Sequence, residues 1–144
     1  MRKRCNRKRV VALPPRGLRP MVPADIKRDL SIVHLENLDI IAKGAADEST
    51  LWDIVGGVLT WSCVANRLEL GMLEMDAQLG LTTRLVDHYR ETGRIEFQAD
   101  DYNLARAGTI VMDHLAELVD HPTAKIAAEW SERRVAQMVE ACHG

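Results

Sequence analysis

The longest regular apolar pattern in the chain lies between Leu51 and Tyr89. Its centre, residues 54–66, contains no acidic or basic side chain. That is typical of a buried segment, yet the segment is shorter than the about 18 apolar residues that a membrane span needs. Apolar positions recur every three or four residues, as they do along one face of an α-helix. They are Ile54, Val58, Trp61, Ala65, Leu68, Met72, Met75, Leu79, Val86 and Tyr89, with Thr82 as a polar member.

This pattern stays in phase across Gly71, where the sequence contains no recognisable turn. It predicts one long helix over 48–92, bent near Gly71, with Gly80 as a second candidate for a bend and Gly93 as a left-handed cap. Such a helix would be on the order of 60 Å long. Because a small domain cannot cover a helix of that length, the pattern also predicts that another copy of the chain covers its far end, as in a dimer.

Three other helices are predicted around the long one. Pro23 and Pro122 each occupy a position that favours a first helical turn. The predicted ranges are 24–43, about 101–120, and 123 to about 142. In the first range, the residues at helical spacing are Ile26, Leu30, Val33, Leu38 and Ile41. Phe97, in the connector before the second range, is expected to fill the core between helices.

The composition supports an all-α fold with an unusual N-terminal segment. The chain of 144 residues is long enough for one domain with a core. Strong helix formers fill it after residue 24, and strand-like alternation is nearly absent. The first 22 residues instead combine cations with prolines, a composition that cannot form a packed helix. We therefore predict a flexible basic arm over 1–22 and a single α-helical domain over 23–144, a helical bundle built on the long bent central helix.

The arm and the domain carry opposite charges. Residues 1–22 contain eight basic residues and no acid, so residues 23–144 hold the remaining 11 basic and all 21 acidic residues. The arm cations are Arg2, Lys3, Arg4, Arg7, Lys8, Arg9, Arg16 and Arg19. Such a segment binds phosphates by releasing counterions. Because it has no aromatic residues, it cannot stack on bases. We therefore expect salt-sensitive, nonspecific binding to nucleic acid, or binding to an acidic partner. The alternative is a solvated arm, or an arm that lies on the acidic body of its own or a neighbouring subunit.

A glycine pair within the buried stretch indicates a close helix contact. Gly56 and Gly57 cost roughly 1 kcal/mol each relative to alanine in a helix, a loss that is reasonable where a second helix packs against the backbone. Trp52 lies about half a turn from the main apolar face. Trp52 is either an exposed anchor in an interface or a core tryptophan that the first helix covers. We predict that Trp52, Gly56 and Gly57 form an interface for dimerisation or partner capture.

The sequence contains no recognisable catalytic, cofactor or metal motif. His114, Glu117 and His121 lie near one face of a predicted helix and could share a metal ion, but this spacing is common in charged helices, so a solvated face is the favoured interpretation. Ser62 and Cys63 lie inside the buried stretch, where a nucleophile would have no access to substrate. We predict a protein that is not an enzyme and that needs no cofactor or metal.

The cysteines and the chain start bear on the cellular location. Cys5, Cys63 and Cys142 are odd in number and irregularly spaced, so they predict reduced thiols rather than a disulfide framework. The apolar run Val10–Leu13 is too short for a signal peptide. A cytoplasmic protein without membrane association is expected.

Three short parts of the sequence, together with the predicted long middle helix, resemble small uncharacterised proteins encoded by proteobacterial phages and prophages. They are the basic start Met1–Arg4, the segment Asn37–Asp39 leading into Gly44, and the block Asn103–His114. The resemblance implies a phage origin and a bacterial host cytoplasm, but no catalytic residues. Small phage proteins of this kind often inhibit a host machine, as anti-CRISPR and other anti-defence proteins do. The alternatives are a nucleic-acid-associated regulator that binds through its arm and a metal-dependent helical enzyme.

Overall fold

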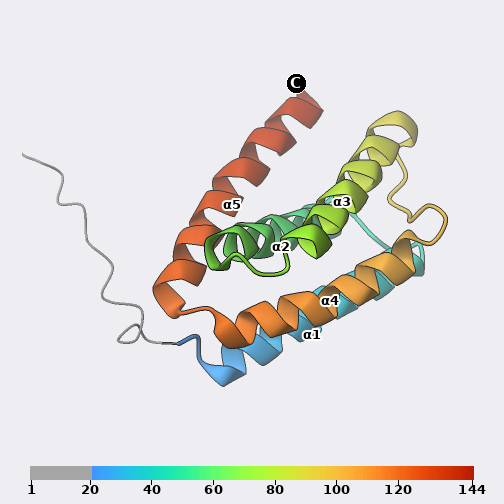
Figure 1. The fold of residues 1–144 in the computed structure, drawn as a ribbon. Coiled ribbons are helices and arrows are strands. Elements are labelled where there is room, and N and C mark those ends of the chain that lie inside the picture. Colours follow the sequence, from blue (N-terminus) through green and yellow to red (C-terminus); the bar gives the residue numbers. More distant parts are fainter. Residues whose placement is uncertain (1–20) are drawn as a thin grey trace, which may run out of the picture.

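The computed structural model describes residues 21–144, which fold almost entirely into helices (Figure 1). The five helices of this part are α1 (Ala24–Ala42), α2 (Glu48–Leu68), α3 (Met72–Thr92), α4 (Asp101–Leu118) and α5 (His121–His143). The predicted all-α class is confirmed. All eight arm cations lie outside the described residues. Within 21–144, no helix is both long enough and apolar enough to cross a membrane.

Local capping signals account for several helix ends. Asp47 accepts a hydrogen bond from the Thr50 backbone N–H at 2.9 Å, so α2 begins where its sequence predicts. Gly93 has a φ of 72° and ends α3 as a left-handed cap. Asp120 accepts from the Thr123 backbone N–H at 2.8 Å and begins α5. The sequence predicts the first two of these ends, because each depends on residues within one turn. It places the start of the last helix at 123, two residues after the observed start at His121.

The prediction of one long helix over 48–92 is wrong. Helix α2 ends at Leu68, and the chain passes through two left-handed residues, Glu69 with a φ of 56° and Gly71 with a φ of 66°, before α3 begins. The Leu70 backbone N–H donates to the Ala65 carbonyl at 3.1 Å, which closes the end of α2 in the manner of a Schellman motif. Because α3 packs against α2 after this turn, two helices joined by a turn are favoured over one continuous helix.

The reversal removes the structural reason for expecting a dimer. Helices α2 and α3 pack on each other, so the chain contains no 48–92 rod whose far end a second copy must cover. The dimer stays a prediction, for which light scattering of the purified protein is the direct measurement.

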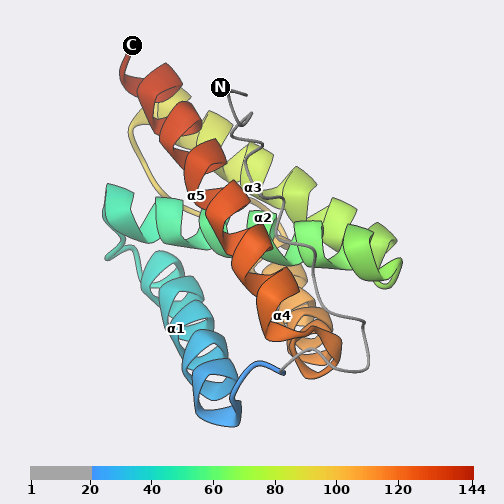
Figure 2. The ribbon, with the colours of Figure 1, turned by 90° about the vertical axis from the view of Figure 1, so that its left-hand side faces the viewer.

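Helix α2 is the central element of the fold. It contacts each of the other four helices, and Figure 2 shows α5 crossing in front of it. Its buried residues belong to two core clusters, one around Leu51 and Ile54 and one around Val58 and Val64. Phe97 is half-buried against the first cluster, as expected. The uncharged stretch 54–66 therefore lies at the centre of the bundle.

Helix α1 buries only part of its apolar pattern. Leu38 and Ile41, near its C-terminal end, are 1% exposed, whereas Ile26, Leu30 and Val33 are between 42% and 51% exposed. The first half of α1 thus presents an apolar face that no other element of residues 21–144 covers. Leu30 and Val33 of this face line a groove between α1 and α5.

Candidate binding groove

Side chains of two helices contact the glycine pair of α2. Ser131 of α5 donates its hydroxyl to the Gly56 carbonyl at 2.7 Å. A Cβ atom added to Gly56 would lie 3.6 Å from Val135 Cγ2, and one added to Gly57 would lie 3.4 Å from His34 Nδ1. Gly56 therefore faces α5 and Gly57 faces α1. Both helices belong to the same chain and contact the pair through side chains at ordinary distances, so the backbone-to-backbone packing expected from the sequence stays a prediction.

A groove with a volume of about 650 Å³ lies between α1 and α5. Helix α2 forms its floor, where the lining includes Trp52, both glycines and Trp61. Leu30 and Val33 of α1 form one wall, and Val135 of α5 contributes to the other. Because Leu30 and Val33 are each 51% exposed, the uncovered apolar face of α1 opens into this groove.

The charge of the groove is negative. Among residues 21–144, its lining contains the carboxylates of Asp53 and Glu132 and no lysine or arginine. His34 also lines it, and burial lowers the pKa of His34 below its ordinary value, although Asp113 opposes this effect. His34 is therefore neutral near pH 7, and the described lining presents two carboxylates beside apolar walls.

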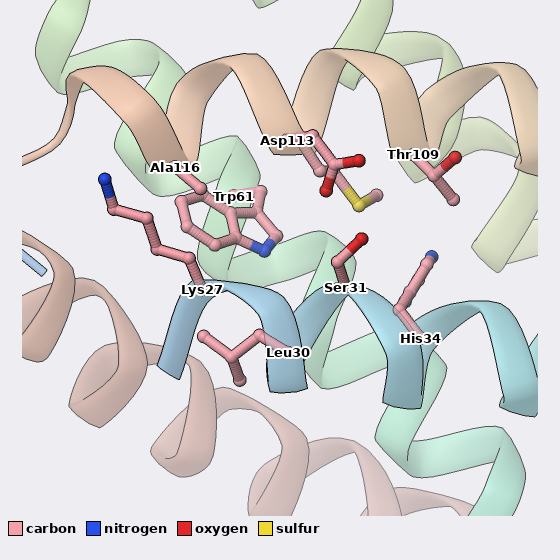
Figure 3. A pocket seen from close by; sticks show the side chains of 9 residues that line it. Lys27, Leu30, Ser31, His34, Trp61, Thr109, Asp113 and Ala116 are labelled. Atoms are coloured by element: carbon pink, nitrogen blue, oxygen red, sulfur yellow. The ribbon is translucent and has the colours of Figure 1, made fainter. Parts of the chain in front are cut away.

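A second, much smaller cavity lies next to the groove, between α1 and α4 (Figure 3). Ser31 and His34 point from α1 toward Asp113 and Thr109 of α4. Serine, histidine and aspartate are the residue types of a nucleophilic triad, but no hydrogen bond joins these three described side chains, as such a triad requires. The volume of about 20 Å³ is enough for about one water molecule. This cavity lacks the room and the geometry for nucleophilic chemistry.

The lowered pKa of His34 predicts that acid destabilises the protein. Because the folded-state pKa lies below the ordinary value of 6.5, the unfolded chain binds more protons as the pH falls through 6.5, so the His34 contribution to stability is fully present above that pH and is lost below it. We expect the free energy of unfolding to fall between about pH 7.5 and about pH 5.5, and to fall less in His34→Asn. Urea denaturation at the two pH values measures both. An equal pH effect in the variant would contradict this assignment.

Trp52 is a core residue rather than an exposed anchor. It is 9% exposed and belongs to the core cluster that includes Leu38 and Ile41 of α1. This agrees with the alternative of a core tryptophan that the first helix covers. Its indole N–H donates to Glu48 Oε1 at 3.0 Å, and Glu48 also pairs with His143 at the C-terminal end. Only the remaining edge of Trp52 contributes to the groove.

The three residues considered for metal binding do not share a helix. Helix α4 ends at Leu118, so His121 belongs to the first turn of α5 while His114 and Glu117 belong to α4. Glu117 Oε2 lies 3.6 Å from Lys27 Nζ of α1. Among residues 21–144, no group of three or more histidine, cysteine, aspartate or glutamate side chains could hold a metal ion.

Gly56 and Gly57 in the groove floor were predicted as interface residues, whereas the residues of the groove walls were not. Leu30 and Val33 were recognisable as apolar helix positions, yet nothing local showed that they remain uncovered. Ser131 carries no sequence signal, because its role depends on a backbone carbonyl 75 residues away. Comparison with family models, curated proteins and solved structures finds no match for this chain.

Proposed function

We propose that the protein is a non-enzymatic binding protein that captures an apolar segment of a protein partner in the groove between α1, α2 and α5. The observation that carries this proposal is the uncovered apolar face of α1, which opens onto a floor where glycines and tryptophans meet. A groove volume of about 650 Å³ lies within the range of about 300–1,000 Å³ that is typical of binding sites.

The groove has the composition of a recognition site. Exposed Leu30 and Val33 supply apolar area that a partner would remove from water. The carboxylates of Asp53 and Glu132 would attract and orient a cationic residue of the partner. Helix-in-groove recognition uses this combination of an apolar track and flanking charges.

In its biological setting, the protein acts as an inhibitor that blocks a host protein or nucleoprotein complex in the bacterial cytoplasm. Support for this part comes from the resemblance to phage proteins and from the presence of a groove suited to partner capture. Anti-defence activity, for example of the anti-CRISPR type, is the form of inhibition we favour.

A pull-down from bacterial lysate with matched variants tests the proposal. Leu30→Gln with Val33→Asn alters the groove wall, and Leu73→Gln with Ile110→Gln alters side chains that are 83% and 72% exposed and lie outside the groove. We expect the wall variant to recover at least about tenfold less of a partner than the wild type recovers. A tenfold loss of affinity corresponds to about 1.4 kcal/mol of binding free energy. Equal recovery by the wall variant and the wild type would reject the groove as the capture site.

The second candidate function is nucleic-acid association through the arm. Eight cations without an acid in residues 1–22 favour it. Replacing all eight with glutamine in the full chain is expected to abolish DNA or RNA binding at low salt and to flatten the dependence of the binding constant on salt. Unchanged binding in a salt titration would remove this candidate.

A further inference from the structure

We propose that the groove is also the docking site for the arm of the same chain, with residues 10–20 as the occupant. The arm can dock there whether or not an external partner uses the same groove. The inference depends on where the arm is attached, on its reach, and on the chemistry of the two surfaces.

The arm is attached beside the N-terminal ends of the two helices that form the groove walls. Met21 lies three residues before α1 and forms an isolated β-bridge with Asp120, which caps the start of α5. Both wall helices therefore begin near Met21. The groove lining then extends along α1 from Leu30 to Asn37 and along α5 from Ala128 to Ala136.

The arm is long enough to follow this track. From the start of α1 to Asn37 the distance along the helix is about 20 Å, at about 1.5 Å per residue. Residues 10–20 in a polyproline conformation would span about 34 Å, at about 3.1 Å per residue. The segment can therefore turn back from Met21 and run along the whole groove.

The apolar part of the arm matches the apolar part of the groove. Val10–Leu13 is the only apolar run in the arm, and Pro14–Pro15 follows directly. Proline has no backbone N–H, so it can be buried without leaving a donor unpaired. Proline-rich segments characteristically dock in grooves that contain aromatic side chains, and Trp52 and Trp61 lie in the floor of this one.

The charges of the two surfaces are complementary. The part of the groove lining that belongs to residues 21–144 has two carboxylates and no lysine or arginine, while Arg16 and Arg19 follow the paired prolines in the arm. Beyond the groove, residues 23–144 contain 21 acidic and 11 basic side chains, whereas the arm has eight cations and no acid. Arm docking would cover Leu30 and Val33 and neutralise Asp53 and Glu132.

Limited proteolysis of the full chain, without any partner, tests the docking. Trypsin cleaves after Arg9 and Arg16, and mass spectrometry follows both cuts with time. We expect the groove-wall variant Leu30→Gln with Val33→Asn to be cut after Arg16 about tenfold faster than the wild type, because docking protects the site in proportion to the docked population. The distant pair Leu73→Gln with Ile110→Gln should be cut at the wild-type rate.

Two further measurements separate docking from other causes. Circular dichroism of the groove-wall pair and of the distant pair must show wild-type helix content and melting, since all four altered side chains are exposed. A third variant, Val11→Asp with Leu13→Asp, leaves residues 21–144 unaltered. It should accelerate the cut after Arg16 as the groove-wall variant does. Equal cleavage rates in the wild type and the groove-wall variant would overturn the proposal. Protection that increases with protein concentration would overturn it as well, because the occupant would then be the arm of a second copy.

Discussion

Replacing Trp52 with alanine is expected to lower the free energy of unfolding by about 3–5 kcal/mol. The side chain is 9% exposed and packs against residues of α1, α2 and α3 in the first core cluster, so its removal leaves a cavity that the rigid helix contacts cannot close. The variant also loses the indole donor to Glu48. Since the total stability of a small domain is about 5–15 kcal/mol, the loss is large. Urea denaturation measures it.

Trp130→Ala is the matched control. Trp130 lies on α5 and is 41% exposed, so its replacement is expected to change the free energy of unfolding by less than about 1 kcal/mol. A Trp52 variant as stable as the wild type would contradict the assignment of Trp52 to the core. Trp52→Ala is also unsuitable as a test of the groove, because a loss of partner binding would follow from unfolding alone. The exposed wall residues Leu30 and Val33 are suitable for that test.

Replacing Gly71 with alanine is expected to destabilise the protein by about 1–2 kcal/mol, because Gly71 occupies the left-handed region that costs an L-residue about that much. Its φ is 66°, and an added Cβ would lie 3.0 Å from Val111 Cγ1 of α4. The sign of the effect discriminates between two folds. In a continuous helix over 48–92, the same substitution would stabilise by about 1 kcal/mol.

Gly80→Ala controls for helix propensity. Gly80 lies inside α3 with ordinary helical geometry, and an added Cβ would meet Arg84 Nη1 at 3.5 Å, a normal contact. This variant is expected to raise the free energy of unfolding by about 0.5–1 kcal/mol. If Gly71→Ala and Gly80→Ala were both stabilising in denaturant titrations, the chain reversal at residues 69–71 would be rejected.

Features that depend on neighbouring residues were predictable from the sequence. The helix start at Glu48 follows from an aspartate that caps a backbone N–H three positions later. The left-handed Gly93 follows from glycine at the end of a helical pattern. The all-α class and the central position of the uncharged stretch follow from periodicity and composition, which describe each helix without reference to its partners.

The chain itself therefore determined the all-α class and where several of the helices begin and end. Only the tertiary structure decided the reversal at Glu69 and Gly71, the burial of Trp52 and the opening of the groove. An apolar face that continues in phase is compatible with one rod or with two helices folded together, and the difference lies in contacts such as that of α3 with α2 and α4. Exposure of Leu30 and Val33 likewise depends on the separation of α1 and α5, two elements far apart in the sequence.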